Sequence, residues 1–309
     1  MIIVRISGGL GNQMFQYALI CALKKKYLNT EIKADILDYK KVHAHTGYSL
    51  HRYFSIDIPI ATKKEVDQIS YIPCDFMRPE LKTGIKGIFY KLGYKFYHKQ
   101  REYLKPFNIS DYVYNIYNPE VFQLNPEKHW YLNGYWQNMM YFTSICQDFH
   151  SIFKFTRNFS NVDAGIIEEI KRQNSVSVHV RRGDYVSSDF DICNKSYYLN
   201  AKRIIEDRIE SPVYYFFSDE PEYVEREFKD FTNKIVISHK TEDCDIDMYM
   251  MAQCKHSINA NSSFSFWGSV LKQHSGIIIS PKYTMVKQYK KYESVHLDDW
   301  IIIDNLGKY

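Results

Sequence analysis

Short runs of β-branched and aromatic residues alternate with amphipathic stretches through the second half of the chain. The run at 175–180 reads S-V-S-V-H-V and predicts a buried strand. Helical and extended patterns then follow one another at short intervals, which is typical of βαβ units and a parallel sheet. The predicted strands are 175–180, 213–218, 234–237, 256–260 and 276–280, and the predicted helices are 162–173, 196–209, 221–231, 243–254 and 263–272.

The first half opens on a related pattern of strand, glycine-rich turn, helix and strand. This β-turn-α-β succession is how a Rossmann-like half begins. We therefore expect an α/β protein built from two Rossmann-like domains, 1–158 and 159–309. The predicted elements of the first domain are strands at 2–6, 31–37 and 129–135, helices at 13–27 and 139–153, and a polar linker at 155–160.

Composition narrows the classes of function. Of the 309 residues, 45% are hydrophobic and 25% are charged, which is an ordinary globular balance. The net charge of +4 permits an anionic ligand or a membrane surface but does not argue for nucleic acid. The six cysteines include no C-x-x-C pair and are typical of reduced thiols rather than a disulfide frame or zinc site. Because the sequence has neither a signal segment nor a long apolar run, we expect a cytoplasmic protein and interpret its N-x-S/T triplets as chance matches.

The strongest candidate chemistry follows the predicted strand at 175–180. The residues H-V-R-R-G-D-Y place His179, Arg181, Arg182 and Asp184 around a glycine. Ligands of an open α/β sheet bind just beyond the carboxyl ends of its strands. Arginine is permanently charged and presents a planar fork that matches phosphate oxygens. We interpret this stretch as a diphosphate-binding site. The alternative is a surface turn whose Arg–Asp pairs only solubilise the protein.

The glycine-rich turn S-G-G-L-G-N near the N-terminus is a second candidate. After Gly9 and Gly11, a methionine stands where a dinucleotide-binding fingerprint needs its third glycine, and no lysine completes a P-loop. What remains is a turn that brings a ligand to backbone amides at a helix N-terminus, with Asn12 and Gln13 beside it. A purely structural turn is equally consistent with this pattern.

Two further strand ends carry polar groups. Asp219 follows the strand at 213–218 and offers a carboxylate to a ribose or a base. The run N-S-S-F-S-F-W at 261–267 offers hydroxyl groups and a helix N-terminus that can bind phosphate, although Ser262 or Ser263 is equally a plain N-cap. Because parallel strands bring their carboxyl ends to one edge, we expect Arg181, Asp219 and Ser262 to meet there.

Two charged stretches have competing interpretations. The stretch at 82–105 alternates basic and aromatic residues. We favour a helix with a solvated basic face; the alternative is a surface that touches an acceptor glycan or an anionic membrane, peripherally at its inner face. The run D-C-D-I-D at 243–247 has the D-x-D spacing of a metal site, but it stands at the start of a predicted helix, where acids favour the dipole. We therefore expect no metal.

Three motifs together resemble the α-1,2-fucosyltransferases of glycosyltransferase family 11: G-G-L-G-N-Q-M-F-Q-Y-A at 8–18, H-V-R-R-G-D-Y at 179–185 and N-S-S-F-S-F-W at 261–267. The resemblance covers nearly the whole chain, with no recognised motif at 40–128. It implies a GT-B-like architecture, in which two Rossmann-like domains face each other across a cleft. It also implies transfer of fucose from GDP-β-L-fucose, held by the C-terminal domain, to the 2-hydroxyl of a terminal galactose. The transfer would proceed with inversion, without a cofactor or an essential metal.

The resemblance further implies roles for the candidate residues. Arg181 would neutralise the departing β-phosphate, which stabilises the transition state more than the ground state. His179 and Asp184 would buttress Arg181, and Asp219 would lie near the guanosine. Arginine is a poor base, so another group would take the acceptor's proton. The other implied residues are Arg182, Ser262, Ser263 and Phe264 on the donor side, and Gly9, Gly11, Asn12 and Gln13, which would reach the cleft from the N-terminal domain.

Two alternatives to this function stay open. One is an inverting transferase of another linkage or acceptor on the same scaffold. The other is a non-catalytic module that binds a nucleotide or a carbohydrate, which would not need Arg181, Arg182 and Asp184 to stabilise a leaving group.

Overall fold

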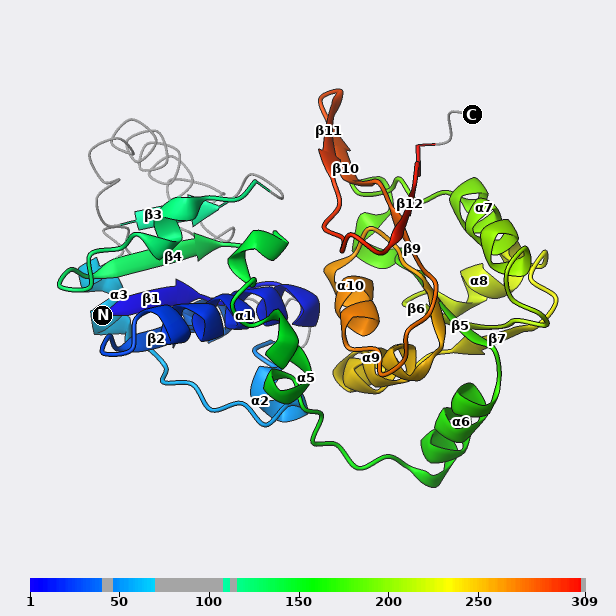
Figure 1. The fold of residues 1–309 in the computed structure, drawn as a ribbon, viewed down its shortest axis with the longest axis horizontal. Helices are drawn as coiled ribbons and strands as arrows, with labels where there is room; N and C mark the ends of the chain where they lie inside the picture. The colour runs from blue at the N-terminus through cyan, green and yellow to red at the C-terminus, as the bar shows by residue number, and fades with distance from the viewer. Residues whose placement is uncertain (41–46, 70–107, 112–115, 307–309) are drawn as a thin grey trace, which may run out of the picture. The chain divides into compact units, whose positions relative to one another are not determined.

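The computed structural model describes residues 1–40, 47–69, 108–111 and 116–306 (Figure 1). The chain divides into two compact units, Met1–His51 with Ile56–Gln147, and Arg52–Ser55 with Asp148–Tyr309. Each unit has its own parallel sheet flanked by helices, so the predicted α/β class with two Rossmann-like domains is confirmed. The basic and aromatic stretch at 82–105 lies outside the described residues.

The first unit is built on a four-stranded parallel sheet with the order β2-β1-β4-β3. The helix α1 links β1 to β2 and is buried along most of its length, which suits its largely apolar sequence. Its last turn carries Lys24, Lys25 and Lys26, where cations complement the helix dipole. The elements of this unit are β1 Ile2–Arg5, α1 Leu10–Lys26, β2 Ile32–Asp35, η1 Leu37–Lys40, α2 Leu50–Tyr53 (which ends in the second unit), α3 Lys63–Ile69, β3 Asn108–Asp111, η4 Pro119–Phe122, β4 Trp130–Gly134, η5 Met139–Tyr141 and η6 Cys146–Asp148, whose last residue begins the second unit.

The second unit contains a six-stranded parallel sheet with the order β12-β9-β8-β5-β6-β7. Taken from β7, the strands follow the order 3-2-1-4-5-6 of a Rossmann fold, and the direction of winding reverses between β5 and β8. The elements of this unit are α5 Phe149–Ile152, α6 Asn161–Arg172, β5 Ser175–Val180, η7 Gly183–Tyr185, α7 Lys195–Glu206, β6 Val213–Ser218, α8 Pro221–Glu227, β7 Lys234–Ile237, η8 Thr241–Asp243, α9 Cys244–Gln253, β8 His256–Ile258, α10 Ser263–Val270, β9 Ile278–Pro281, β10 Tyr283–Lys287, β11 Lys290–Glu293 and β12 Ile301–Ile303.

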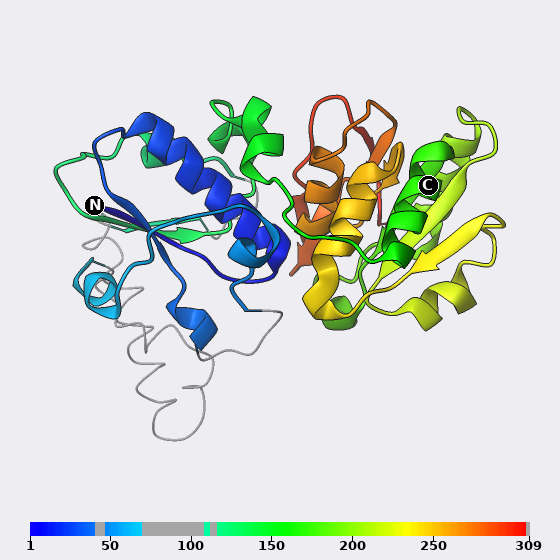
Figure 2. The same cartoon turned by 90° about the horizontal axis from the view of Figure 1, so that it is seen from below.

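Both faces of the six-stranded sheet are covered by helices. Along β6, Tyr214 and Phe216 pack against α7 and α8, while Tyr215 and Phe217 pack against α6 and α9. Figure 2 shows α6 and α8 on opposite sides of β7. A strand buried on both faces needs no alternation of apolar and polar residues, which explains the uninterrupted aromatic run in β6.

The predicted helix at 139–153 is wrong. The structure has three short helices there, η5, η6 and α5, and the division between the two units falls within the segment. Phe142 packs against Phe15 of the first unit, whereas Phe149 and Phe153 pack against Trp267 of the second. A single straight helix would not deliver these rings to two different cores.

The polar stretch at 155–160 is not a free linker, because its beginning pairs with a distant segment. The backbone of Thr156 donates to Tyr53, that of Ser55 donates to Lys154, and Phe54 pairs with Phe155 in an antiparallel bridge. This contact draws Arg52–Ser55 into the second unit.

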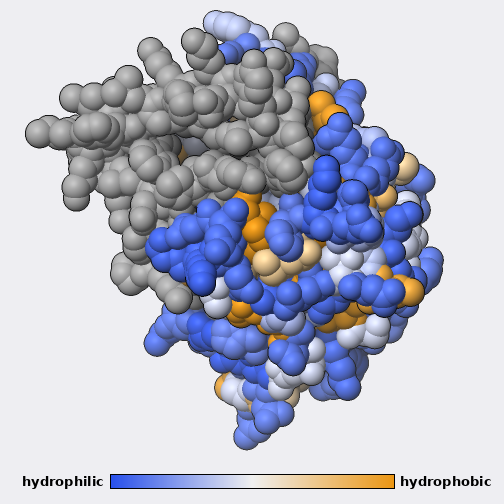
Figure 3. Space-filling model, turned by 90° about the vertical axis from the view of Figure 1, so that its left-hand side faces the viewer, coloured by the Kyte–Doolittle hydropathy of each residue, from blue (hydrophilic) through white to orange (hydrophobic). Residues whose placement is uncertain are grey.

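The surface of the first unit seen in Figure 3 is mainly hydrophilic where it is described, with apolar residues in small patches. Large apolar side chains such as Phe15, Trp136 and Tyr141 are instead almost fully buried. Among the helices of the described residues, none is both long and apolar enough to cross a membrane.

Candidate functional site

The candidate site lies where the winding of the second sheet reverses. The loops that follow β5 and β8 leave the same edge, because these two parallel strands are direct neighbours. In open α/β sheets this edge forms the crevice in which ligands bind. The motif at 179–185 spans the end of β5, and the motif at 261–267 follows β8 and opens α10.

Arg181 is held between two carboxylates. One guanidinium nitrogen lies 2.6 Å from Asp184, and another lies 2.9 Å from Asp219. The guanidinium carbon also stands 5.7 Å from the centre of the Tyr185 ring. The two ion pairs fix the orientation of the guanidinium. Because 27% of the Arg181 side chain remains exposed, part of its charge still faces solvent.

Gly183 is required by packing rather than by an unusual backbone angle. A Cβ atom added at this position would stand 2.6 Å from a carboxylate oxygen of Asp219. The other oxygen of Asp219 accepts a hydrogen bond of 2.9 Å from the backbone N–H of Arg182. A larger residue at this point would therefore displace the Asp219 carboxylate, which joins the end of β6 to the arginine loop.

Arg182 turns away from Arg181 toward α8. Its guanidinium carbon lies 4.1 Å from the centre of the Tyr223 ring, within cation–π range. Its Nε stands 3.5 Å from Glu220, and one terminal nitrogen stands 3.8 Å from Asp191. The two neighbouring arginines thus face different partners, and Arg181 is the one held by Asp184 and Asp219.

His179 is buried in β5, with its imidazole ring centre 5.5 Å from that of Phe264. Burial, together with the nearby positive charge of Arg181, lowers the pKa of His179 to about 3. The imidazole is therefore neutral at physiological pH. Its Nδ1 is buried without a hydrogen-bond partner among the described residues.

The N-terminus of α10 meets the arginine loop. Ser262 caps the helix by accepting a 3.3 Å hydrogen bond from the backbone N–H of Phe264. Tyr185 donates to the backbone carbonyl of Asn261 over 3.4 Å. The structure therefore brings His179, Arg181, Asp184, Asp219, Ser262, Ser263 and Phe264 to one edge of the sheet, as their positions after parallel strands predict.

In the first unit, the turn after β1 is tied into its own surroundings. Gln13 is fully buried and donates to the carbonyls of Gly8 and Gly47, while its oxygen accepts from the backbone of Ser49. The turn's left-handed residue is Gly8, with φ of +80°, while Gly9 is the extended N-cap of α1. The side chain of Gln13 thus holds the loop at 47–49 within the unit.

Asn12 and Gln137 face each other across the strand ends of the first sheet. Gln137 donates to the Asn12 side chain over 2.9 Å, joining the loop after β4 to the first turn of α1, which follows the neighbouring strand β1. Trp136, next to Gln137, is fully buried and has a φ of +58°, a costly conformation for a tryptophan. Trp136 is therefore a core residue of the first unit.

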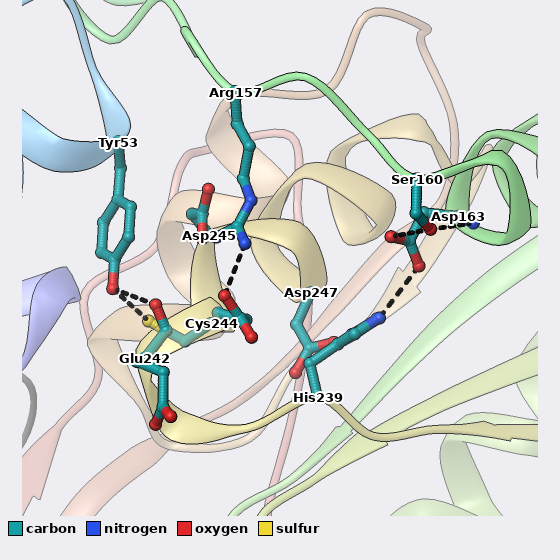
Figure 4. Close-up of polar contacts among 10 residues, drawn as sticks. Tyr53, Arg157, Ser160, Asp163, His239, Glu242, Cys244, Asp245 and Asp247 are labelled. Carbon is teal, nitrogen blue, oxygen red and sulfur yellow. Dashed lines mark hydrogen bonds and ion pairs between the residues drawn. The ribbon is translucent and has the colours of Figure 1, made fainter.

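The acidic run at 243–247 is engaged in ion pairs (Figure 4). Arg157 binds Asp243 at 2.5 Å and Asp245 at 2.9 Å, and His239 binds Asp247 at 2.6 Å. Among the residues that the structure describes, no group of three or more His, Cys, Asp and Glu side chains is arranged to hold a metal ion. Asp243 and Asp245 thus anchor the segment before α6 to the start of α9, and Asp247 holds His239, which follows β7.

Sequence reasoning missed three residues that shape this edge. Asn261 is buried and donates to the carbonyls of Phe190 and Thr284, so it joins two loops. Tyr185 and Asn261 stand inside the motifs, and that membership is the signal that could have identified them. Tyr223 carries no such signal, because its contact with Arg182 depends on how α8 packs.

Comparison with known proteins places this architecture among the glycosyltransferases. The model of glycosyltransferase family 11 matches residues 1–304, so the chain belongs to this family. The family resemblance of the three motifs is thereby confirmed.

Curated relatives extend over most of the chain. An α-1,2-colitosyltransferase of Escherichia coli is 32% identical, covering 91% of each chain. The O-antigen biosynthesis glycosyltransferase WbnK of Escherichia coli is 27% identical, covering 96% of this chain and 98% of its own. The mouse galactoside 2-α-L-fucosyltransferase Sec1 is 23% identical, covering all of this chain and 75% of its own. Among solved structures, the fucosyltransferase NodZ from Bradyrhizobium is similar with a TM-score of 0.49 at 16% identity, covering 88% of this chain and 92% of its own.

Proposed function

We propose that the protein is an inverting α-1,2-fucosyltransferase that moves L-fucose from GDP-β-L-fucose to the 2-hydroxyl of a terminal galactose in a glycan. Membership of family 11 and relatives named for fucosyl or colitosyl transfer support this proposal. The single observation that carries it is the Arg181 guanidinium, which Asp184 and Asp219 hold beside the point where the winding of the second sheet reverses.

The proposed step is one displacement. As the bond between fucose and phosphate breaks, negative charge grows on the departing GDP, and Arg181 stabilises this charge. Because Arg181 is oriented before the reaction, little reorganisation is needed when the charge develops. Backbone amides at the start of α10, with Ser262, Ser263 and Phe264, receive the phosphate oxygens. The galactose hydroxyl attacks from the opposite face, which inverts the sugar centre, and a group other than arginine takes its proton.

The neighbours of Arg181 support it in different ways. The neutral His179 leaves the positive charge of the site concentrated on the arginines. We propose that Asp219, for which the family resemblance implies a place near the guanosine, also orients Arg181 through their ion pair. In the first unit, we propose that Gly9, Gly11 and Asn12 shape the acceptor side.

Substitution of Arg181 tests the proposal. We expect Arg181→Ala to lower turnover by at least about a hundredfold with the fold retained, as for loss of one preorganised donor. Arg181→Lys should recover only part of the loss, because an ammonium lacks the fork that meets both carboxylates. Arg226→Ala, on the exposed side chain of another arginine, is the matched control. A purified Arg181→Ala protein within a few-fold of wild type would reject the assigned role.

A second candidate donor is nucleotide-activated colitose, because the relative at 32% identity is named for colitosyl transfer. Assays with both donors against a panel of galactose-ended and other glycans separate the two functions and reveal any other linkage. Turnover should be unchanged in a chelator, since we propose no metal. A protein that binds GDP but transfers neither sugar to any acceptor would instead be a binding module.

A further inference from the structure

The hairpin β10–β11 is fixed at its root and projects at its tip (Figure 1). At the root, Asn305 bonds to both the backbone N–H and the carbonyl of Tyr283, each over 3.0 Å. Asn261 donates to the carbonyl of Thr284, and the backbone of Val286 donates to Asp189. These bonds hold the root at the carboxyl edge of the six-stranded sheet.

The tip of this hairpin is strained and carries an aromatic ring in solvent. Gln288 and Tyr289 form the two-residue connection, with φ of 49° and 66°. Two consecutive positive φ angles are typical of a tight hairpin turn, but such turns favour Asn and Gly rather than these larger residues. Tyr289 is fully exposed, so no contact within the described protein compensates for this strain.

The same tip concentrates positive charge. Lys287 and Lys290 stand directly opposite each other in the strand register, a position in which like charges repel. Lys291 follows them, and none of these three lysines forms an ion pair with another described residue. The ammonium of Lys290 lies 5.2 Å from the Tyr292 ring centre, and that of Lys291 lies 5.0 Å from the Tyr283 ring centre.

We propose that this tip, Lys287 to Lys291, docks the protein on an anionic phospholipid surface. A projecting tip fits a flat, diffuse layer of negative charge better than a small ligand, which needs a concavity. Three lysines gain energy near such a surface, and a tyrosine ring suits the depth of the headgroups. An anionic surface removes the repulsion between Lys287 and Lys290, and its headgroup layer takes up the exposed ring of Tyr289. This proposal does not depend on which sugar the protein transfers.

Vesicle sedimentation tests the proposal with the whole protein. Wild-type protein should bind vesicles of phosphatidylglycerol and phosphatidylcholine but not vesicles of phosphatidylcholine alone, and added salt should weaken the binding. The triple variant K287S/K290S/K291S should bind about a hundredfold more weakly, since each lysine contributes about a factor of five near an anionic surface. Tyr289→Ser should bind several-fold more weakly at unchanged charge.

A second triple variant, K64S/K229S/K240S, removes the same charge from other exposed positions and is the matched control. It should keep most of the binding. Thermal unfolding of both triple variants verifies that they are folded. Equal binding to the two vesicle types, equal loss in the two triple variants, or binding to soluble polyphosphate but not to vesicles would each overturn the proposal.

Discussion

Lys272 is a cation in an unfavourable position. It is 8% exposed, just after α10, and its ammonium donates to the Ser257 hydroxyl over 3.0 Å. That hydroxyl also accepts from Ser177, which is itself buried. Burial lowers the pKa of Lys272 to about 8 from its ordinary value near 10.5. At neutral pH the folded protein therefore carries a charge that the buried site disfavours.

Replacing Lys272 with methionine should stabilise the protein at neutral pH. The lysine pKa is lower in the folded than in the unfolded state, so its penalty is fully present below pH 8 and fades as the pH rises toward 10.5. We expect a gain on the order of 2 kcal/mol in the free energy of unfolding near neutral pH, and less at high pH. Urea unfolding of the wild type and of Lys272→Met, at neutral pH and again at high pH, measures the difference in the free energy of unfolding. Lower stability of Lys272→Met at both values would show that the bond to Ser257 outweighs the penalty.

At the level of single residues, the sequence predicts which side chains lie at the same edge of the sheet better than it predicts which of them form ion pairs or hydrogen bonds. Arg181 and Asp219 follow neighbouring parallel strands, and this alone predicts that they share an edge. Their ion pair depends also on the bend of the loop at Gly183, which no local pattern reveals. Gln13 shows the opposite case: its position suggested a ligand, but a loop 34 residues away along the chain occupies its amide.

At the level of elements, His239 joins the helices α6 and α9. Its imidazole lies 3.1 Å from Asp163 at the start of α6 and 2.6 Å from Asp247 in the first turn of α9 (Figure 4). The hydrogen bond that His239 donates to Asp247 is the largest cause that raises the pKa of His239 to about 9, and the two carboxylates together outweigh the effect of burial. Asp163 is in turn bonded to Ser160, the N-cap of α6.

The stability that His239 contributes should depend on pH. Its pKa is higher in the folded state than the ordinary value of 6.5, so the contribution is full below about pH 6.5 and is lost as the pH rises through 9. His239→Gln keeps hydrogen-bonding atoms but not the charge. The difference in unfolding free energy between the wild type and this variant should therefore be larger at pH 6 than at pH 9.5. A difference that is the same at both values would show that His239 acts only through neutral hydrogen bonds.

Strong periodicity made the elements of the second unit predictable, and β5, β6 and β7 begin and end where the pattern predicts. The hairpin β10–β11 was missed because neither strand shows a period of two: β10 reads Y-T-M-V-K with its first three residues buried in succession, and β11 reads K-K-Y-E with no apolar face. The short strand β12 was missed because its three residues give too little pattern. Local sequence thus determines the buried parallel strands, whereas surface elements depend on contacts that the sequence does not display.

At the scale of the whole molecule, the chain enters the second unit twice. It does so at Arg52–Ser55 and again from Asp148 onward, and the two passages are joined by the bridge between Phe54 and Phe155. Tyr53 strengthens this junction by donating to the backbone carbonyl of Glu242 over 2.7 Å. A four-residue passage has neither a break in composition nor a periodic pattern, so sequence analysis could not separate it from the first unit.

The stability of the second unit should therefore depend on a residue from the first fifth of the chain. Phe54 is 1% exposed and packs edge-on against Phe153 and at a tilt against Phe155, with ring centres 5.4 and 4.9 Å away. Phe54→Ala should cost about 3 kcal/mol, the usual range for a large cavity in a core. Hydrogen exchange read by mass spectrometry should show faster exchange in peptides from 148–160 and 242–253, while peptides from α1 keep their protection. Phe15→Ala, which empties a site against Phe142 in the first unit, should give the reverse pattern. If Phe54→Ala instead loosened α1 and left 148–160 protected, Arg52–Ser55 would belong energetically to the first unit.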